Sequence, residues 1–132
     1  MIRQWSEAFN AHDAVGVAAL YAEDACVSHP SYREPLQGRK AVQDDTLAYM
    51  IAVPNVTTEL TRIVGDQDCV TAEITISGVH AGPLVPATGK LPLTGRRVRF
   101  PLALFCRFGP TGRIVEEHRH DDAPALRRQL TH

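Results

Sequence analysis

The sequence predicts an α+β fold in which a curved antiparallel sheet of four to six strands wraps over three N-terminal helices. Apolar residues recur at helical spacing in the first half of the 132-residue chain and alternate with polar residues in the second half. Turn-forming residues separate the alternating runs. Helices packed on one face of a curved sheet leave a central pocket, which commonly binds a ligand. The length fits a single domain, residues 1–132.

Three segments of the first half have apolar residues at helical spacing. The first begins at the amino terminus, and Asp13 can cap the second through its side-chain oxygen. The second ends near residue 24, a short β-like run follows over residues 25–29, and the third helix runs from Gly38 to just before Pro54. The apolar faces of these helices are formed by Ile2, Trp5 and Phe9, then by Val17, Leu20 and Tyr21, and then by Val42, Thr46, Tyr49, Met50 and Val53.

The second half of the chain has the period of two that is typical of strands. Residues 56–64, 70–77 and 98–108 are predicted strands, and a tight turn joins the first two. Residues 81–95 contain three prolines and three glycines, which favours a long loop. A glycine-containing hairpin turn leads into the last strand, residues 113–121.

Composition argues against several classes of partner. The 14 basic and 15 acidic residues leave no positive excess for nucleic acid. No apolar run approaches the ~20 residues of a membrane span, and the start does not resemble a signal peptide. We therefore expect a cytoplasmic protein without nucleic-acid or membrane partners. Cys26, Cys69 and Cys106 are too widely spaced for a disulfide framework or zinc knuckle, which predicts reduced, buried packing residues.

Three stretches of the chain form a family pattern. The first runs from Phe9-Asn-Ala-His-Asp13 to His29-Pro30, and the second combines Gly78-Val-His80-Ala-Gly82 with Leu93-Thr-Gly-Arg96. The third is the most specific: a strand that ends on Asp122, seven residues before Gln129-Leu130. Together they resemble the SnoaL-like polyketide cyclases, within the nuclear transport factor-like superfamily. The resemblance implies a cone-shaped α+β fold.

The same resemblance implies that Asp122 is the acid/base group of an intramolecular aldol cyclisation. The expected substrate is an apolar, polyketide-like molecule, and the reaction needs no cofactor. His118 stands where members of the family commonly have a tryptophan. On an unbroken last strand, the side chains of Glu116, His118, His120 and Asp122 share one face with Ile114. We predict that this face lines the pocket, so that Val115, Glu117, Arg119 and Asp121 point away from it.

Two further histidines are candidate site residues. His80 follows the apolar face of the strand before it and is predicted to point inward. His29 stands before Pro30, where the related ketosteroid isomerases place a proton-abstracting aspartate. The predicted apolar lining of the substrate site consists of Trp5, Phe9, Tyr21, Tyr49, Phe100 and Leu104.

Other functions remain open from the sequence. The chain could be an isomerase, or an epoxide hydrolase or hydratase in which an aspartate activates a water held by Glu116, His118 or His120. His118 and His120 with Asp122 and His80 could also bind one metal ion. The non-enzymatic alternative is a ligand-binding or dimerisation module. In each case we expect a small hydrophobic molecule as ligand and a homodimer as the assembly.

Overall fold

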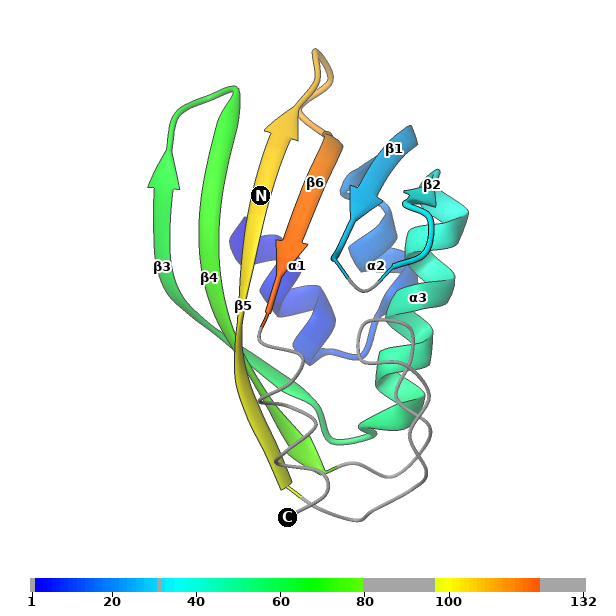
Figure 1. The fold of residues 1–132 in the computed structure, drawn as a ribbon, viewed down its shortest axis with the longest axis vertical. Coiled ribbons are helices and arrows are strands. Elements are labelled where there is room, and N and C mark those ends of the chain that lie inside the picture. The colour runs from blue at the N-terminus through cyan, green and yellow to red at the C-terminus, as the bar shows by residue number, and fades with distance from the viewer. Residues whose placement is uncertain (1, 31, 80–96, 122–132) are drawn as a thin grey trace.

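The structure is a computed structural model that describes residues 2–30, 32–79 and 97–121. It contains three helices and six strands in these parts of the chain, and the long strands curve around the helices (Figure 1). In chain order the elements are α1 (Ile2–Asn10), α2 (Ala14–Ala18), β1 (Tyr21–Ser28), β2 (Leu36–Gln37), α3 (Arg39–Ala52), β3 (Thr57–Gly65), β4 (Cys69–Val79), β5 (Arg97–Phe108) and β6 (Ile114–His120).

The strands form one sheet in the order β2-β1-β6-β5-β4-β3. Four of the five strand pairs are antiparallel, and β1 is parallel to β6. This mixed α+β architecture with a curved six-stranded sheet confirms the predicted fold class. The predicted loop over residues 81–95 lies outside the described residues. Within the described part of the chain, no helix has both the length and the apolar character needed to cross a membrane.

The helices form where the apolar spacing predicts them, with one exception. Ile2, Trp5 and Phe9 are buried on α1, and Asp13 accepts a hydrogen bond from the backbone nitrogen of Gly16 at the start of α2. The predicted extension of this second helix to residue 24 is wrong, because α2 ends at Ala18 and the chain continues as β1. Short apolar runs fit either periodicity, and here pairing with β6 favours the strand.

A β-bulge in β6 changes the direction in which its side chains point. Ile114 pairs with Phe108 and Glu116 pairs with Arg107, so two steps along β6 match one step along β5. Val115 is therefore the extra residue. After Val115, the odd-numbered residues Glu117, Arg119 and Asp121 point toward the interior, and the even-numbered residues point away from it.

The predicted face of the last strand is consequently wrong. Glu117 and Arg119 are buried, and the side chain of Asp121 is 1% exposed. His118 and His120 are exposed on the opposite face, and Glu116 is half-exposed there. The cysteine prediction also needs correction: Cys106 is buried and Cys26 is half-buried, but Cys69 is exposed.

Candidate functional site

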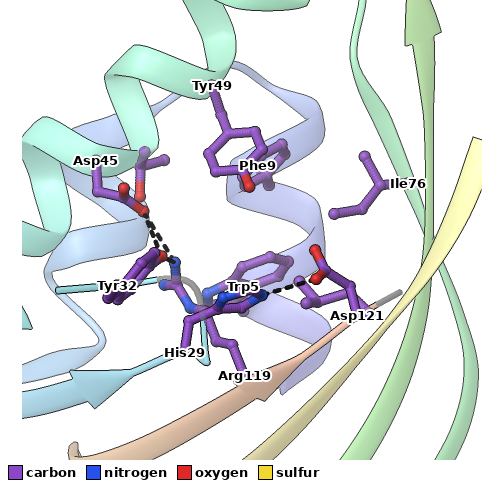
Figure 2. Close-up of a pocket in the computed structure, with 11 residues that line it drawn as sticks. Trp5, Phe9, His29, Tyr32, Asp45, Tyr49, Ile76, Arg119 and Asp121 are labelled. Carbon is purple, nitrogen blue, oxygen red and sulfur yellow. Dashed lines mark hydrogen bonds and ion pairs between the residues drawn. The ribbon is translucent and has the colours of Figure 1, made fainter. Parts of the chain in front are cut away.

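A small cavity lies between the helices and the inner face of the sheet. About 20 Å³ of it can be reached by the centre of a water molecule, and on this measure one water needs about 10–15 Å³. The enclosed part of the cavity therefore has room for one water or for the reacting group of a larger ligand. Its lining residues come from α1, α3, the ends of β1 and β6, and the middle of β4 and β5 (Figure 2); they are Trp5, Phe9, His29, Tyr32, Asp45, Thr46, Tyr49, Ile76, Leu102, Arg119 and Asp121.

His29 and Asp121 form a buried pair at the wall of this cavity. Nε2 of His29 lies 2.8 Å from Oδ1 of Asp121, and the two side chains are 2% and 1% exposed. Each residue directly follows the last residue of its strand, β1 or β6. Because these two strands are parallel neighbours, their carboxyl ends meet at one edge of the sheet. The second oxygen of Asp121, Oδ2, is buried without a hydrogen-bond partner among the described residues.

Arg119 lies at the centre of a second buried cluster. Its Nε donates to Oε2 of Glu117 at 2.6 Å, and its Nη1 donates to Oδ2 of Asp45 at 2.9 Å. The hydroxyls of Tyr32 and Tyr21 accept from Nη1 and Nη2. Burial alone would lower the pKa of Arg119, but Glu117, Tyr32, Tyr21 and Asp45 together outweigh it and the pKa is raised. Arg119 is therefore a permanent positive charge that orients Asp45.

Asp45 reaches the cavity from the opposite side, on α3 (Figure 2). Its side chain is 3% exposed, and its Oδ1 has no hydrogen-bond partner among the described residues. Burial raises the pKa of Asp45, and the pairing with Arg119 only partly opposes this effect. Burial also raises the pKa of Tyr32 to about 12, so Tyr32 is a neutral hydroxyl that donates to Asp45.

Aromatic rings form much of the remaining wall. Trp5 and Phe9 are stacked with their ring centroids 5.1 Å apart, and the indole nitrogen of Trp5 donates to the Tyr21 hydroxyl. Tyr49 lines the cavity from α3. Burial raises the pKa of Tyr49 well above its usual value, with smaller contributions from Tyr32, Asp45 and Asp121. The cavity thus combines two carboxylates that each have an unpaired oxygen with an aromatic lining.

The structure brings together only some of the residues that the sequence singled out. His29, Trp5, Phe9 and Tyr49 line the cavity, whereas Tyr21, Phe100 and Leu104 are buried outside its lining. His118 and His120 are on the other face of β6, where His118 contacts Ser28 and His120 packs edge-on against Phe105. Asp122 and His80 lie outside the described residues, so their assigned roles stay predictions.

Sequence reasoning missed four polar residues of the site. Tyr32 and Asp45 carried no motif, and Arg119 and Asp121 were assigned to the wrong face of the last strand. One signal was present: Glu117, Arg119 and Asp121 alternate in charge at every second position, as expected of an internal ion-pair network. Among the described residues, no group of three or more histidine, cysteine, aspartate or glutamate side chains could hold a metal ion.

The helices and the curved sheet form the ketosteroid isomerase-like, nuclear transport factor-like α+β fold. A sequence profile of the SnoaL-like domain matches residues 2–117, and the chain belongs to this family. No sequence match to a curated protein was found.

Solved structures share the fold over nearly the whole chain. IdmH, a proposed polyketide cyclase from Streptomyces antibioticus, is 24% identical, with 99% of this chain and 96% of IdmH covered and a TM-score of 0.79. An LEH-like epoxide hydrolase from M. tuberculosis is 16% identical, with 98% and 86% covered and a TM-score of 0.73. A protein with a ketosteroid isomerase-like fold from Catenulispora acidiphila, in complex with trimethylamine, is 16% identical, with 98% and 91% covered and a TM-score of 0.79.

Proposed function

We propose that this SnoaL-like domain is an acid/base enzyme that closes a ring in a small, largely apolar carbonyl compound by an intramolecular aldol reaction. The observation that carries the proposal is the His29–Asp121 pair, 2.8 Å apart and almost fully removed from water at the wall of an aromatic cavity. The imidazole occupies one carboxylate oxygen of Asp121 and leaves Oδ2 without a described partner. Asp121 thus takes the base role that the family resemblance gave to its neighbour Asp122.

The proposed reaction is balanced without any other reactant. Asp121 removes a proton from the carbon next to one carbonyl group, and the resulting enolate attacks a second carbonyl carbon of the same molecule. A carbon–carbon bond forms, and the electron pair of the attacked carbonyl moves to its oxygen. That oxygen takes back the proton, so the product is an isomer of the substrate. One positioned acid/base group contributes roughly 10²–10⁴ in rate, and holding the two carbons in contact supplies much of the rest.

Two neighbours of the pair support this chemistry. His29 is placed to orient the carboxylate and to stabilise its charge between turnovers. Tyr49 lines the same cavity, and its raised pKa keeps its hydroxyl protonated. A neutral hydroxyl in the same cavity is available to donate to the enolate oxygen.

Ring closure of 2,6-heptanedione to 3-hydroxy-3-methylcyclohexanone, followed by NMR, tests the proposal. We expect wild-type protein to accelerate the closure, and Asp121→Asn to lower the rate by about 10²- to 10⁴-fold because its amide cannot accept the proton. Asp122→Asn and His118→Gln are the controls and should leave the rate within about twofold of wild type. Full activity of a folded Asp121→Asn protein would refute the role of Asp121, and loss in Asp122→Asn alone would assign the base to Asp122.

A second candidate is the addition of water, as in epoxide opening. The observation that favours it is the size of the cavity, which fits one water beside the unpaired Oδ2 of Asp121. Cyclohexene oxide in ¹⁸O-labelled water distinguishes the two reactions. Formation of the diol with one ¹⁸O atom, dependent on Asp121 and without ring closure of the diketone, would replace the cyclase proposal with a hydrolase.

A further inference from the structure

We infer that the cavity binds the cationic head of a small organic ammonium compound between the carboxylates of Asp45 and Asp121. The inference concerns the charge of the ligand, so it goes beyond the reaction proposed above and does not depend on it. It is carried by the balance of buried charge, by two unpaired carboxylate oxygens, and by the aromatic wall.

Among the residues that the structure describes, the buried groups around the cavity carry an excess of negative charge. Three carboxyl groups, those of Asp45, Glu117 and Asp121, are accompanied by the guanidinium of Arg119 and the imidazole of His29. Even if the imidazole is counted as protonated, three ionised carboxylates exceed two cations by one charge. A buried, uncompensated negative charge is costly, and a cation placed beside it removes that cost. Burial raises the pKa of Asp45, with Arg119 opposing and Glu117 adding a smaller effect, and a cation beside Asp45 would favour its ionised form.

The unpaired oxygens show where the cation belongs. Oδ1 of Asp45 and Oδ2 of Asp121 are both buried, and neither has a partner among the described residues. Both residues line the same cavity, from α3 on one side and from the end of β6 on the other (Figure 2). Carboxylate oxygens accept hydrogen bonds, so the missing partner must be a donor. A protonated amine offers several N–H donors and the compensating charge, whereas a ketone oxygen or an anion offers neither.

The remaining lining favours an organic cation over a metal ion. Trp5, Phe9 and Tyr49 line the same cavity as the two carboxylates (Figure 2). Aromatic rings attract a cation through their negative faces, and they accommodate the alkyl substituents of an amine. The enclosed volume fits the charged group of the ligand, because an ammonium group is about the size of one water, and the alkyl part extends beyond this volume.

Isothermal titration of the protein with isopropylammonium chloride tests the inference, with isopropanol as the neutral isostere and sodium chloride as the ionic-strength control. We expect saturable binding of isopropylammonium, accompanied by a higher melting temperature, and no saturable binding of the other two compounds. Because each carboxylate makes a charge-assisted hydrogen bond to the ammonium group, Asp45→Asn and Asp121→Asn should each weaken binding by about 10- to 100-fold.

The adjacent residue provides the matched control. Asp44 lies next to Asp45 on α3, but its side chain is exposed and pairs with Lys40, so Asp44→Asn should bind isopropylammonium as wild type does. Equal binding of isopropanol, or unchanged binding in both Asp45→Asn and Asp121→Asn, would overturn the inference. If Asp45→Asn does not fold, because Asp45 anchors Arg119, then Asp121→Asn decides alone.

The ring-closure assay separates this inference from the proposed function. Diketone closure without ammonium binding would overturn the inference and leave the cyclase intact. Ammonium binding without diketone closure or epoxide opening would leave the inference standing and refute the proposed reactions.

Discussion

The carboxylate of Glu117 is completely buried, and it accepts hydrogen bonds from Arg119, from the Tyr21 hydroxyl and from the thiol of Cys106. The same guanidinium of Arg119 also holds Asp45. Because Asp45 belongs to α3 and Glu117 to β6, one side chain connects helix and sheet behind the cavity. A single residue therefore sets the positions of groups from both layers.

Arg119→Met tests how strongly the fold depends on this cation. The substitution leaves two buried carboxylates without their partner, which typically costs about 3–5 kcal/mol of unfolding free energy. Urea denaturation of the variant measures this loss. Glu117→Gln in the Arg119→Met background removes one of the two unpaired buried charges and should recover part of the stability. A loss below about 1 kcal/mol in the single variant would show that water reaches the carboxylates.

The strands and helices were largely predictable because each has a clear period, while the side-chain directions on β6 were not. Three of the four candidate residues on the last strand are displaced by one bulge at Val115, and the fourth, Asp122, lies outside the described residues. A bulge depends on hydrogen bonding to the neighbouring strand, so the local sequence of the last strand does not predict it. Tyr32 and Asp45 enter the site through tertiary packing of a loop and a helix, which periodicity cannot show.

Single-residue deletions test the bulge. Deleting Val115 makes β6 regular opposite β5 and keeps Glu117, Arg119 and Asp121 directed inward, so we expect a folded protein that loses less than about 2 kcal/mol. Deleting His118 instead turns Arg119 and Asp121 outward. The buried carboxylate of Glu117 then has no cationic partner, which should prevent stable folding. Thermal unfolding of the two proteins makes the comparison. Equal damage from both deletions would contradict the assignment of the extra residue.

The arrangement of the whole molecule explains why the site lies where it does. β6 ends opposite Ala103, so in the described residues the first part of β5 has a partner only on its β4 side. Pro101 lies in this part of β5 and lacks a backbone N–H. The edge of β5 that faces away from β4 has no neighbouring strand here among the described residues, so no backbone donor is needed on that side. The helices cover the same region from the inner face (Figure 1). The cavity therefore lies where the described sheet narrows to β5, β4 and β3, beside the parallel ends that carry His29 and Asp121.

If one cavity serves both ligand binding and catalysis, filling it must abolish both. Ile76 on β4 is 4% exposed and lines the cavity, so Ile76→Phe places an aromatic ring in a space with room for about one water. We expect isopropylammonium binding and diketone closure to be lost together, while overpacking costs about 1–3 kcal/mol and leaves the protein folded by circular dichroism. Ile63→Phe adds the same ring at a position on β3 that is 43% exposed, and it should change neither activity. Loss of only one of the two activities in Ile76→Phe would mean that they use different sites, and the single-cavity account of this molecule would fail.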